Sequence, residues 1–195
     1  MARPKNTAGP RAAMIDSAID LIRRRGVAAT SFSDVLADSG APRGSVYHHF
    51  PGGKSQLVTE ATRSAADRLD TAVRKVLEAS DTPGALRALV QIWRRGLDAG
   101  DYAVGCPIVA AALGTEQGAR EVAGATFESW CELIAGKLVA DGTEPPKARA
   151  LAVLIVSALE GALVLAQAQH SGEPLDTVAA ELTALCPQPG RNRAG

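Results

Sequence analysis

The sequence predicts an all-α protein in which a small N-terminal domain of three helices precedes a larger helical domain, with about nine helices altogether. Apolar residues make up 46% of the 195 residues and recur at the spacing of helix faces. Aromatic residues make up only 4%, and an Ala- and Leu-rich composition favours helix over sheet. Gly and Pro separate the periodic segments. We expect domains over residues 1–53 and 54–186, followed by a disordered tail over residues 187–195.

The first helix is expected from Pro10 to Arg25, after a mobile polar arm over residues 1–9, and Gly26 is expected to end it. Arginines at positions 23–25 fall in its last turn, where the helix dipole favours positive charge. Its apolar residues share one side of the helix, which predicts that this side is buried. They are Met14, Ile15, Ala18, Ile19, Leu21 and Ile22.

Residues 31–50 have the pattern of two short helices joined by a tight turn. Ser31 stands three residues before Asp34, which predicts a capping box at the start of the first of them. Gly40 can adopt the left-handed conformation that ends a helix, and Pro42 suits the first turn of the next helix. This is the helix-turn-helix pattern, in which the second helix enters the major groove of DNA. A helical hairpin buried in a core is the alternative.

The charge distribution favours the DNA-binding interpretation, although the net charge is zero. Residues 1–54 contain eight Lys and Arg against four Asp and Glu, whereas the remainder contains 13 basic and 17 acidic residues. The segment with the helix-turn-helix pattern therefore has an excess of four positive charges, which attracts phosphate. Lys54 is expected near the start of the next helix, where it can hold a backbone phosphate.

Periodic segments predict six more helices behind the helix-turn-helix. The fourth is a long rod without interior Gly or Pro, which could transmit a shift between the two domains. The expected ranges are residues 54–79, 83–99, 108–113, 116–140, an apolar helix containing 151–168, and 175–185.

The apolar stretch over residues 151–168 approaches the length of a membrane span, but Glu160 in its middle argues against one. We therefore expect no membrane and a helix that is buried on several sides. Small residues on this helix allow a partner helix to approach closely. With the last helix it is expected to form a four-helix homodimer interface. The interface candidates are Leu151, Ile155, Ala158, Leu159, Gly161, Ala162, Leu175, Val178 and Leu182.

The sequence offers little for an enzyme, a metal or a cofactor, and we expect none of the three. Its three cysteines are far apart and without a C-x-x-C pair, so neither a disulfide framework nor a zinc site is indicated. The three histidines form no ligand or triad spacing. The basic N-terminus lacks the apolar run of a signal peptide, and a cytoplasmic location is expected.

The N-terminal third resembles the TetR-type transcriptional repressors. The resemblance is carried by Gly26, Thr30-Ser31, Val35-Leu36-Ala37, Gly40, Gly44, Val46-Tyr47, His49-Phe50, Lys54 and Leu57. The run Phe50-Pro51-Gly52-Gly53-Lys54, together with Gly105-Cys106-Pro107, is similar to the LmrA/YxaF-like branch. The resemblance implies a C-terminal domain that binds ligand and dimerises. One departure is Pro42, which stands where many members have Ser, so a hydroxyl contact is lost there.

The resemblance also implies the residues that meet double-stranded DNA. Ser31 and Ser33 would approach phosphate or the groove, and Tyr47 and Lys54 would hold phosphates. The residues facing bases would be Arg43, Gly44, Ser45 and His48, whereas His49 is assigned to packing because it shares a face with Phe50.

The implied function is a homodimeric repressor that leaves its palindromic operator when a small hydrophobic or aromatic effector binds. Candidate pocket walls, each with ordinary core as its alternative, are Trp93, Tyr102, Cys106, Ile108, Phe127 and Trp130. An all-α enzyme using Cys106 or a His is the second hypothesis, and an architectural DNA-binding protein without an effector is the third.

Replacing Arg43 should weaken specific DNA binding, because Arg is the side chain best suited to bidentate contact with guanine. We expect Arg43→Ala to cost about 1–3 kcal/mol of specific binding and to relax discrimination between sequences. Fluorescence anisotropy with operator and random duplexes measures both effects, and an equal loss on the two duplexes would contradict base reading.

Overall fold

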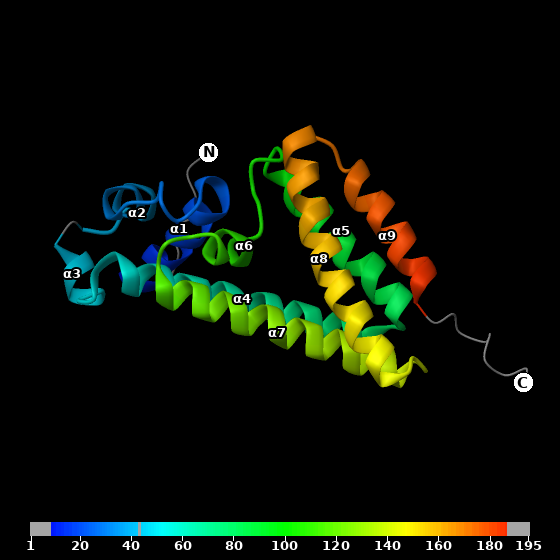
Figure 1. The fold of residues 1–195 in the computed structure, drawn as a ribbon. Helices are drawn as coiled ribbons and strands as arrows, with labels where there is room; N and C mark the ends of the chain where they lie inside the picture. The colour runs from blue at the N-terminus through cyan, green and yellow to red at the C-terminus, as the bar shows by residue number, and fades with distance from the viewer. Residues whose placement is uncertain (1–8, 43, 187–195) are drawn as a thin grey trace, which may run out of the picture. The chain divides into compact units, whose positions relative to one another are not determined.

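The computed structural model describes residues 9–42 and 44–186, which form nine helices and no strand (Figure 1). The predicted all-α class is confirmed for this part of the chain. The helices are α1 (Pro10–Arg25), α2 (Phe32–Ser39), α3 (Ser45–His49), α4 (Gly53–Ala79), α5 (Thr82–Ala99), α6 (Pro107–Ala112), α7 (Gln117–Ala140), α8 (Pro145–Gln169) and α9 (Glu173–Leu185). The expected N-terminal arm, apart from Gly9, and the expected C-terminal tail lie outside the described residues.

One proline lengthens a helix, and another does not enter the helix that it was predicted to begin. Pro145 begins α8 and lengthens it to 25 residues, because its fixed φ and missing N–H fit a first helical turn. Pro42 was expected inside the first turn of α3, but that helix begins only at Ser45. The Pro42 carbonyl instead accepts hydrogen bonds from the Ser45 amide at 2.9 Å and from the Ser45 hydroxyl at 2.7 Å. Pro42 therefore ends the turn and does not enter the helix.

The chain divides into two compact units. The head unit comprises residues up to Asp67 together with Pro107–Gly124, and the body unit comprises Arg68–Cys106 together with the residues from Ala125 onward. Both α4 and α7 contribute residues to each unit. The division expected at residues 53 and 54 does not coincide with this one, chiefly because α6 and the start of α7 pack with the head.

The head unit has its core between α1 and the helices that surround it. Helix α1 packs against α2, α3 and α6, and its Met14 and Ala18 are fully buried. Gly114, which follows α6, permits a close approach, since a Cβ there would lie 2.9 Å from Val27 Cγ2. Other fully or almost fully buried side chains are Ile22, Val35, Val46, Phe50, Leu57, Ile108, Ala111, Ala119 and Ala123. Residues 107–124 therefore complete the hydrophobic core of the head unit.

The body unit is built around α8, which packs against α5 and α9. The start of α5 is fixed by Asp141, whose carboxylate accepts hydrogen bonds from the Thr82 amide at 2.8 Å and the Thr82 hydroxyl at 2.7 Å. Lys137 donates to the other oxygen of Asp141 at 2.9 Å. By length and composition α8 could span a membrane, but 44% of its most apolar window is buried inside the chain. Its inner face belongs to the protein core.

Most of the residues predicted for the dimer interface are buried within their own chain. A side chain already buried in its own chain has little surface left for a partner. Six of the nine candidates are buried in the core of the body unit, namely Leu151, Ile155, Leu159, Ala162, Leu175 and Leu182. Ala158 and Val178 are half-buried, and Gly161 is exposed. The apolar surface that α8 leaves open lies on its other side, where Val153, Leu154, Val164 and Leu165 are each about half exposed.

Candidate nucleic-acid interface

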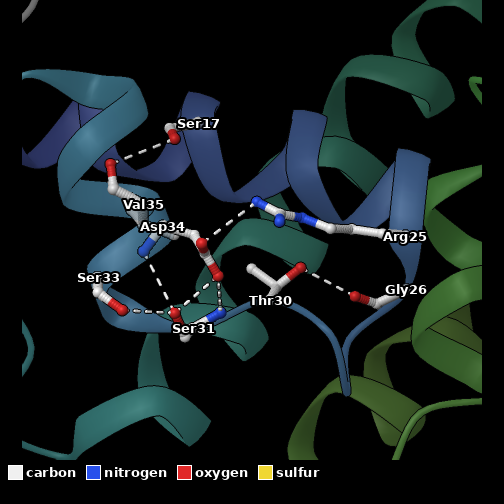
Figure 2. Close-up of polar contacts among 8 residues, drawn as sticks. All are labelled: Ser17, Arg25, Gly26, Thr30, Ser31, Ser33, Asp34 and Val35. Atoms are coloured by element: carbon white, nitrogen blue, oxygen red, sulfur yellow. Dashed lines mark hydrogen bonds and ion pairs between the residues drawn. The ribbon is translucent and has the colours of Figure 1, made fainter.

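The start of α2 is held by a reciprocal pair of hydrogen bonds between Ser31 and Asp34 (Figure 2). The Asp34 amide donates to Ser31 Oγ at 3.2 Å, and the Ser31 amide donates to Asp34 Oδ2 at 3.0 Å. The Ser31 hydroxyl also donates to Asp34 Oδ2 at 2.7 Å. These bonds to the Ser31 side chain and amide hold the pKa of Asp34 below its ordinary value. The predicted capping box is therefore confirmed.

Further contacts attach this capped end to α1 (Figure 2). Arg25 lies 3.6 Å from Asp34 Oδ1, a distance that permits only a weak ion pair at an exposed site. Deeper in the unit, the buried Ser17 hydroxyl donates to the Val35 carbonyl at 3.3 Å, and Thr30 donates to the Gly26 carbonyl at 2.8 Å. Helix α2 is thus fixed to α1 along its first turn.

Helix α3, the candidate recognition helix, has one buried side and one exposed side. Val46 is buried and Phe50, which caps the helix, is fully buried. The guanidinium of Arg11 lies 5.3 Å from the centre of the Phe50 ring and also pairs with Glu60 on α4. On the other side, the side chain of Tyr47 is 70% exposed. Burial of one side fixes which residues of α3 can reach a groove.

The described residues proposed to face DNA on and before α3 are all open or partly open to solvent. Gly44 and His48 are exposed, and Tyr47 packs its ring edge-on against Phe32 at 6.0 Å. Ser45 is half-buried, and its hydroxyl donates a hydrogen bond to the Pro42 carbonyl. His49 is half-buried, with its ring 5.2 Å from that of His48. Arg43, the main base-reading candidate, lies outside the described residues.

Ser31 and Ser33 are less free to meet phosphate than the resemblance implies. Their hydroxyl oxygens lie 2.8 Å apart, and the Ser31 hydroxyl already accepts a hydrogen bond as the N-cap of α2. The Asp34 carboxylate beside them repels phosphate, so a contact from either hydroxyl would have to compete with the capping box.

Lys54 lies in the first turn of α4, where unpaired helix amides also favour an anion. Its ammonium contacts the Ala28 carbonyl at 3.5 Å, which is at the limit of a hydrogen bond. The turn before it is held by Gln56, whose Oε1 accepts from the Gly52 amide at 2.8 Å. A weak internal contact leaves the Lys54 ammonium able to turn toward a phosphate.

A second candidate site is an apolar cavity inside the body unit, with about 520 Å³ of empty space when the part open to solvent is included. Two predicted pocket residues, Trp93 and Trp130, line it. The Trp130 indole donates to Asp70 Oδ1 at 2.6 Å, which fixes the ring. The other lining residues are Leu69, Ala72, Val73, Leu89, Ile92, Ile134, Val156, Leu159 and Glu160.

The remaining four pocket candidates do not line this cavity. Tyr102 donates to Asp98 at 2.9 Å and packs against His170. Ile108 is fully buried in the head unit, and the Phe127 ring packs edge-on against Trp130 at 5.6 Å. The Cys106 thiol interacts with Glu160, which does line the cavity.

Glu160 also lines the cavity, although it was not among the predicted site residues. Its signal was present in the sequence, because a single carboxylate within an apolar helix needs a structural or functional reason.

The fold and the exposed side of α3 define a helix-turn-helix DNA-binding protein of the transcriptional regulator class. Residues 14–61 match the tetR family of bacterial regulatory proteins, and residues 82–181 match the C-terminal domain of LmrA/YxaF-like transcriptional regulators. The chain belongs to the TetR family and to its LmrA/YxaF-like group. It is a DNA-binding regulator and not an enzyme.

Individual relatives agree with this assignment. The chain is 43% identical to Rv0196, an uncharacterized HTH-type transcriptional regulator of Mycobacterium tuberculosis (strain H37Rv), over 91% of this chain and 94% of that protein. It is 34% identical to the HTH-type transcriptional repressor KstR2 of Rhodococcus jostii over 49% of this chain and 47% of that protein. A mutant of the TetR family regulator CifR, solved with 26-bp operator DNA, shares the fold with a TM-score of 0.78 at 21% identity, covering 95% of this chain and 100% of that chain.

Removing the cap hydroxyl should destabilise the head unit. We expect Ser31→Ala to lower the free energy of unfolding by about 1 kcal/mol at neutral pH, since an N-cap bond is lost. Urea denaturation followed by circular dichroism measures the change. Ser55→Ala, on the exposed surface of α4, serves as the control and should stay within about 0.5 kcal/mol.

The cost of Ser31→Ala should also depend on pH. The folded-state pKa of Asp34 is lowered, so its bonds contribute fully above the ordinary value of 3.8 and are lost as pH falls through the lowered pKa. The difference in unfolding free energy between the wild type and Ser31→Ala should therefore shrink below pH 3.8. A difference that stays constant down to pH 2 would contradict the reciprocal bond.

Replacing Lys54 should weaken binding to every DNA sequence. Lys54→Ala should flatten the slope of log affinity against log salt concentration by about one, because one phosphate contact is lost. Titrations at several salt concentrations measure this slope. Lys75→Ala, an exposed lysine further along α4, is the matched control and should leave the slope unchanged.

Proposed function

We propose that the protein is a cytoplasmic, homodimeric repressor that binds a palindromic operator and is released from it by a small hydrophobic or aromatic effector. The observation that carries this proposal is the exposed face of α3, anchored from behind by Val46 and Phe50. The excess of four positive charges in residues 1–54 supports it. The CifR complex with operator DNA and the repressor name of KstR2 support the same class of function.

The open face of α8 is the proposed contact between two copies. Its exposed and half-exposed apolar or small residues repeat every three or four positions, as the seam residues of a coiled coil do. The seam would consist of Ala150, Leu154, Ser157, Gly161, Val164 and Ala168, flanked by Val153 and Leu165. Gly161 has no neighbour within 4 Å of the position that a Cβ would occupy, so a partner helix can approach closely there.

The cavity between Trp93 and Trp130 is the proposed effector site. Its walls are apolar apart from Glu160, and apolar walls with few polar groups are typical of small-molecule sites. An effector that binds more tightly to the form with poor operator affinity would shift the population toward that form. An architectural DNA-binding protein would lack this response and would show little sequence preference.

The test is a footprint on the DNA that flanks the gene. We expect protection of a palindrome whose half-sites lie about one helical turn, or a multiple of one turn, apart. The control is a shuffled duplex of the same length. Equal affinity for the two duplexes would overturn the repressor proposal in favour of the architectural alternative.

A charge on the open face of α8 should separate the two copies. Leu154→Glu places a carboxylate in the proposed seam and should give monomers in size-exclusion chromatography with light scattering, at concentrations where the wild type is dimeric. Val139→Glu on α7 is the control, because Val139 is 42% exposed and Leu154 is 47% exposed. If Leu154→Glu remained dimeric, the open face of α8 would be excluded as the contact between two copies.

A further inference from the structure

The wall of the body cavity contains one carboxylate in unusual surroundings. Glu160 is only 8% exposed, and neither of its oxygens accepts a hydrogen bond of ordinary geometry from the described residues. The thiol of Cys106 is the polar group that acts on it, and a thiol is a weak donor. No lysine or arginine of the described residues pairs with it. The carboxylate is therefore buried without an adequate partner.

This burial has a measurable consequence for Glu160. Burial raises the pKa of Glu160 to about 7, while the hydrogen bond from Cys106 acts in the lowering direction. A buried charge without a partner is destabilising, so natural proteins pair such groups or use them at functional sites. The neutral and the charged form are therefore both populated near neutral pH, and a cationic partner would stabilise the charged form.

The remaining walls of the cavity leave the charge of Glu160 unbalanced. The lining residues from α4, α5 and α7 are aliphatic side chains and the two indoles of Trp93 and Trp130. Indole faces attract cations, and they do so more strongly when water is excluded. The cavity therefore combines aliphatic walls, two indole side chains and one carboxylate.

We propose that this cavity takes an organic cation, with an aromatic or aliphatic body and a protonated amine or a quaternary nitrogen whose charge is balanced by Glu160. The proposal rests on the proposed function, in that it treats the cavity as the effector site and names the chemical class of the effector. An anionic ligand would be repelled by the carboxylate. A neutral ligand could occupy the apolar space but would leave the carboxylate uncompensated.

The test compares two probes of the same shape, the benzyltrimethylammonium cation and neutral neopentylbenzene. Both tryptophans of the chain line the cavity, so quenching of tryptophan fluorescence reports binding directly. In the wild type, without DNA, the cation should bind at least ten times more tightly than the neutral probe. Glu160→Gln should abolish this preference and keep the affinity for neopentylbenzene.

Glu132→Gln is the matched control, because it removes an exposed carboxylate from α7 in the same unit. It should keep the preference for the cation. Equal binding of the two probes to the wild type, or an unchanged preference in Glu160→Gln, would overturn the proposal. Failure of the benzyltrimethylammonium cation to bind the wild type at up to about 1 mM would also overturn it.

A measurement on the wild type alone covers the case in which Glu160→Gln does not fold. Benzyltrimethylammonium keeps its charge at every pH, so its affinity should follow the ionised fraction of Glu160. With the pKa near 7, that fraction and the affinity should rise about tenfold between pH 6 and pH 8. A flat profile would contradict the assignment to Glu160. Operator footprints with the same preparation test the repressor function separately, so the two can fail independently.

Discussion

The reciprocal hydrogen bonds between Ser31 and Asp34 are the constraint on which the DNA-facing surface depends. Helix α2 has eight residues and α3 has five, and helices this short do not persist without capping and tertiary contacts. The cap fixes where α2 begins, and Ser17 attaches that first turn to α1. Gly40, with a φ of 68°, then redirects the chain toward α3. The position of each residue of α3 therefore depends on where α2 begins.

The body unit depends in turn on α8, whose two sides lie in different surroundings. The inner side packs against α5 and α9 and brings Glu160 to the cavity, whereas the outer side leaves an apolar stripe uncovered. The proposed ligand site and the proposed contact between copies therefore share one continuous helix. A change in how α8 rotates about its axis would alter both at once, which offers a physical route for coupling between them.

Local signals allowed much of the head to be predicted. Pro10 and Gly26 marked the ends of α1, and the spacing of Ser31 and Asp34 marked the cap of α2. Non-local packing was not predictable in the same way. Helix α8 is apolar on nearly all sides, so periodicity could not tell its core face from its open face. Likewise, nothing in the local sequence of residues 107–124 showed that α6 packs against α1.

The placement of residues 107–124 has a consequence for protein engineering. The chain crosses between the two units three times, after Asp67, Cys106 and Gly124. A chimaera that grafts only the first 67 residues of a relative would pair a foreign α1 with the native Ile108 and Ala111, which are fully buried. Exchange of operator specificity between relatives therefore requires two separate segments to be transferred together, with the α6 segment chosen to fit the incoming α1.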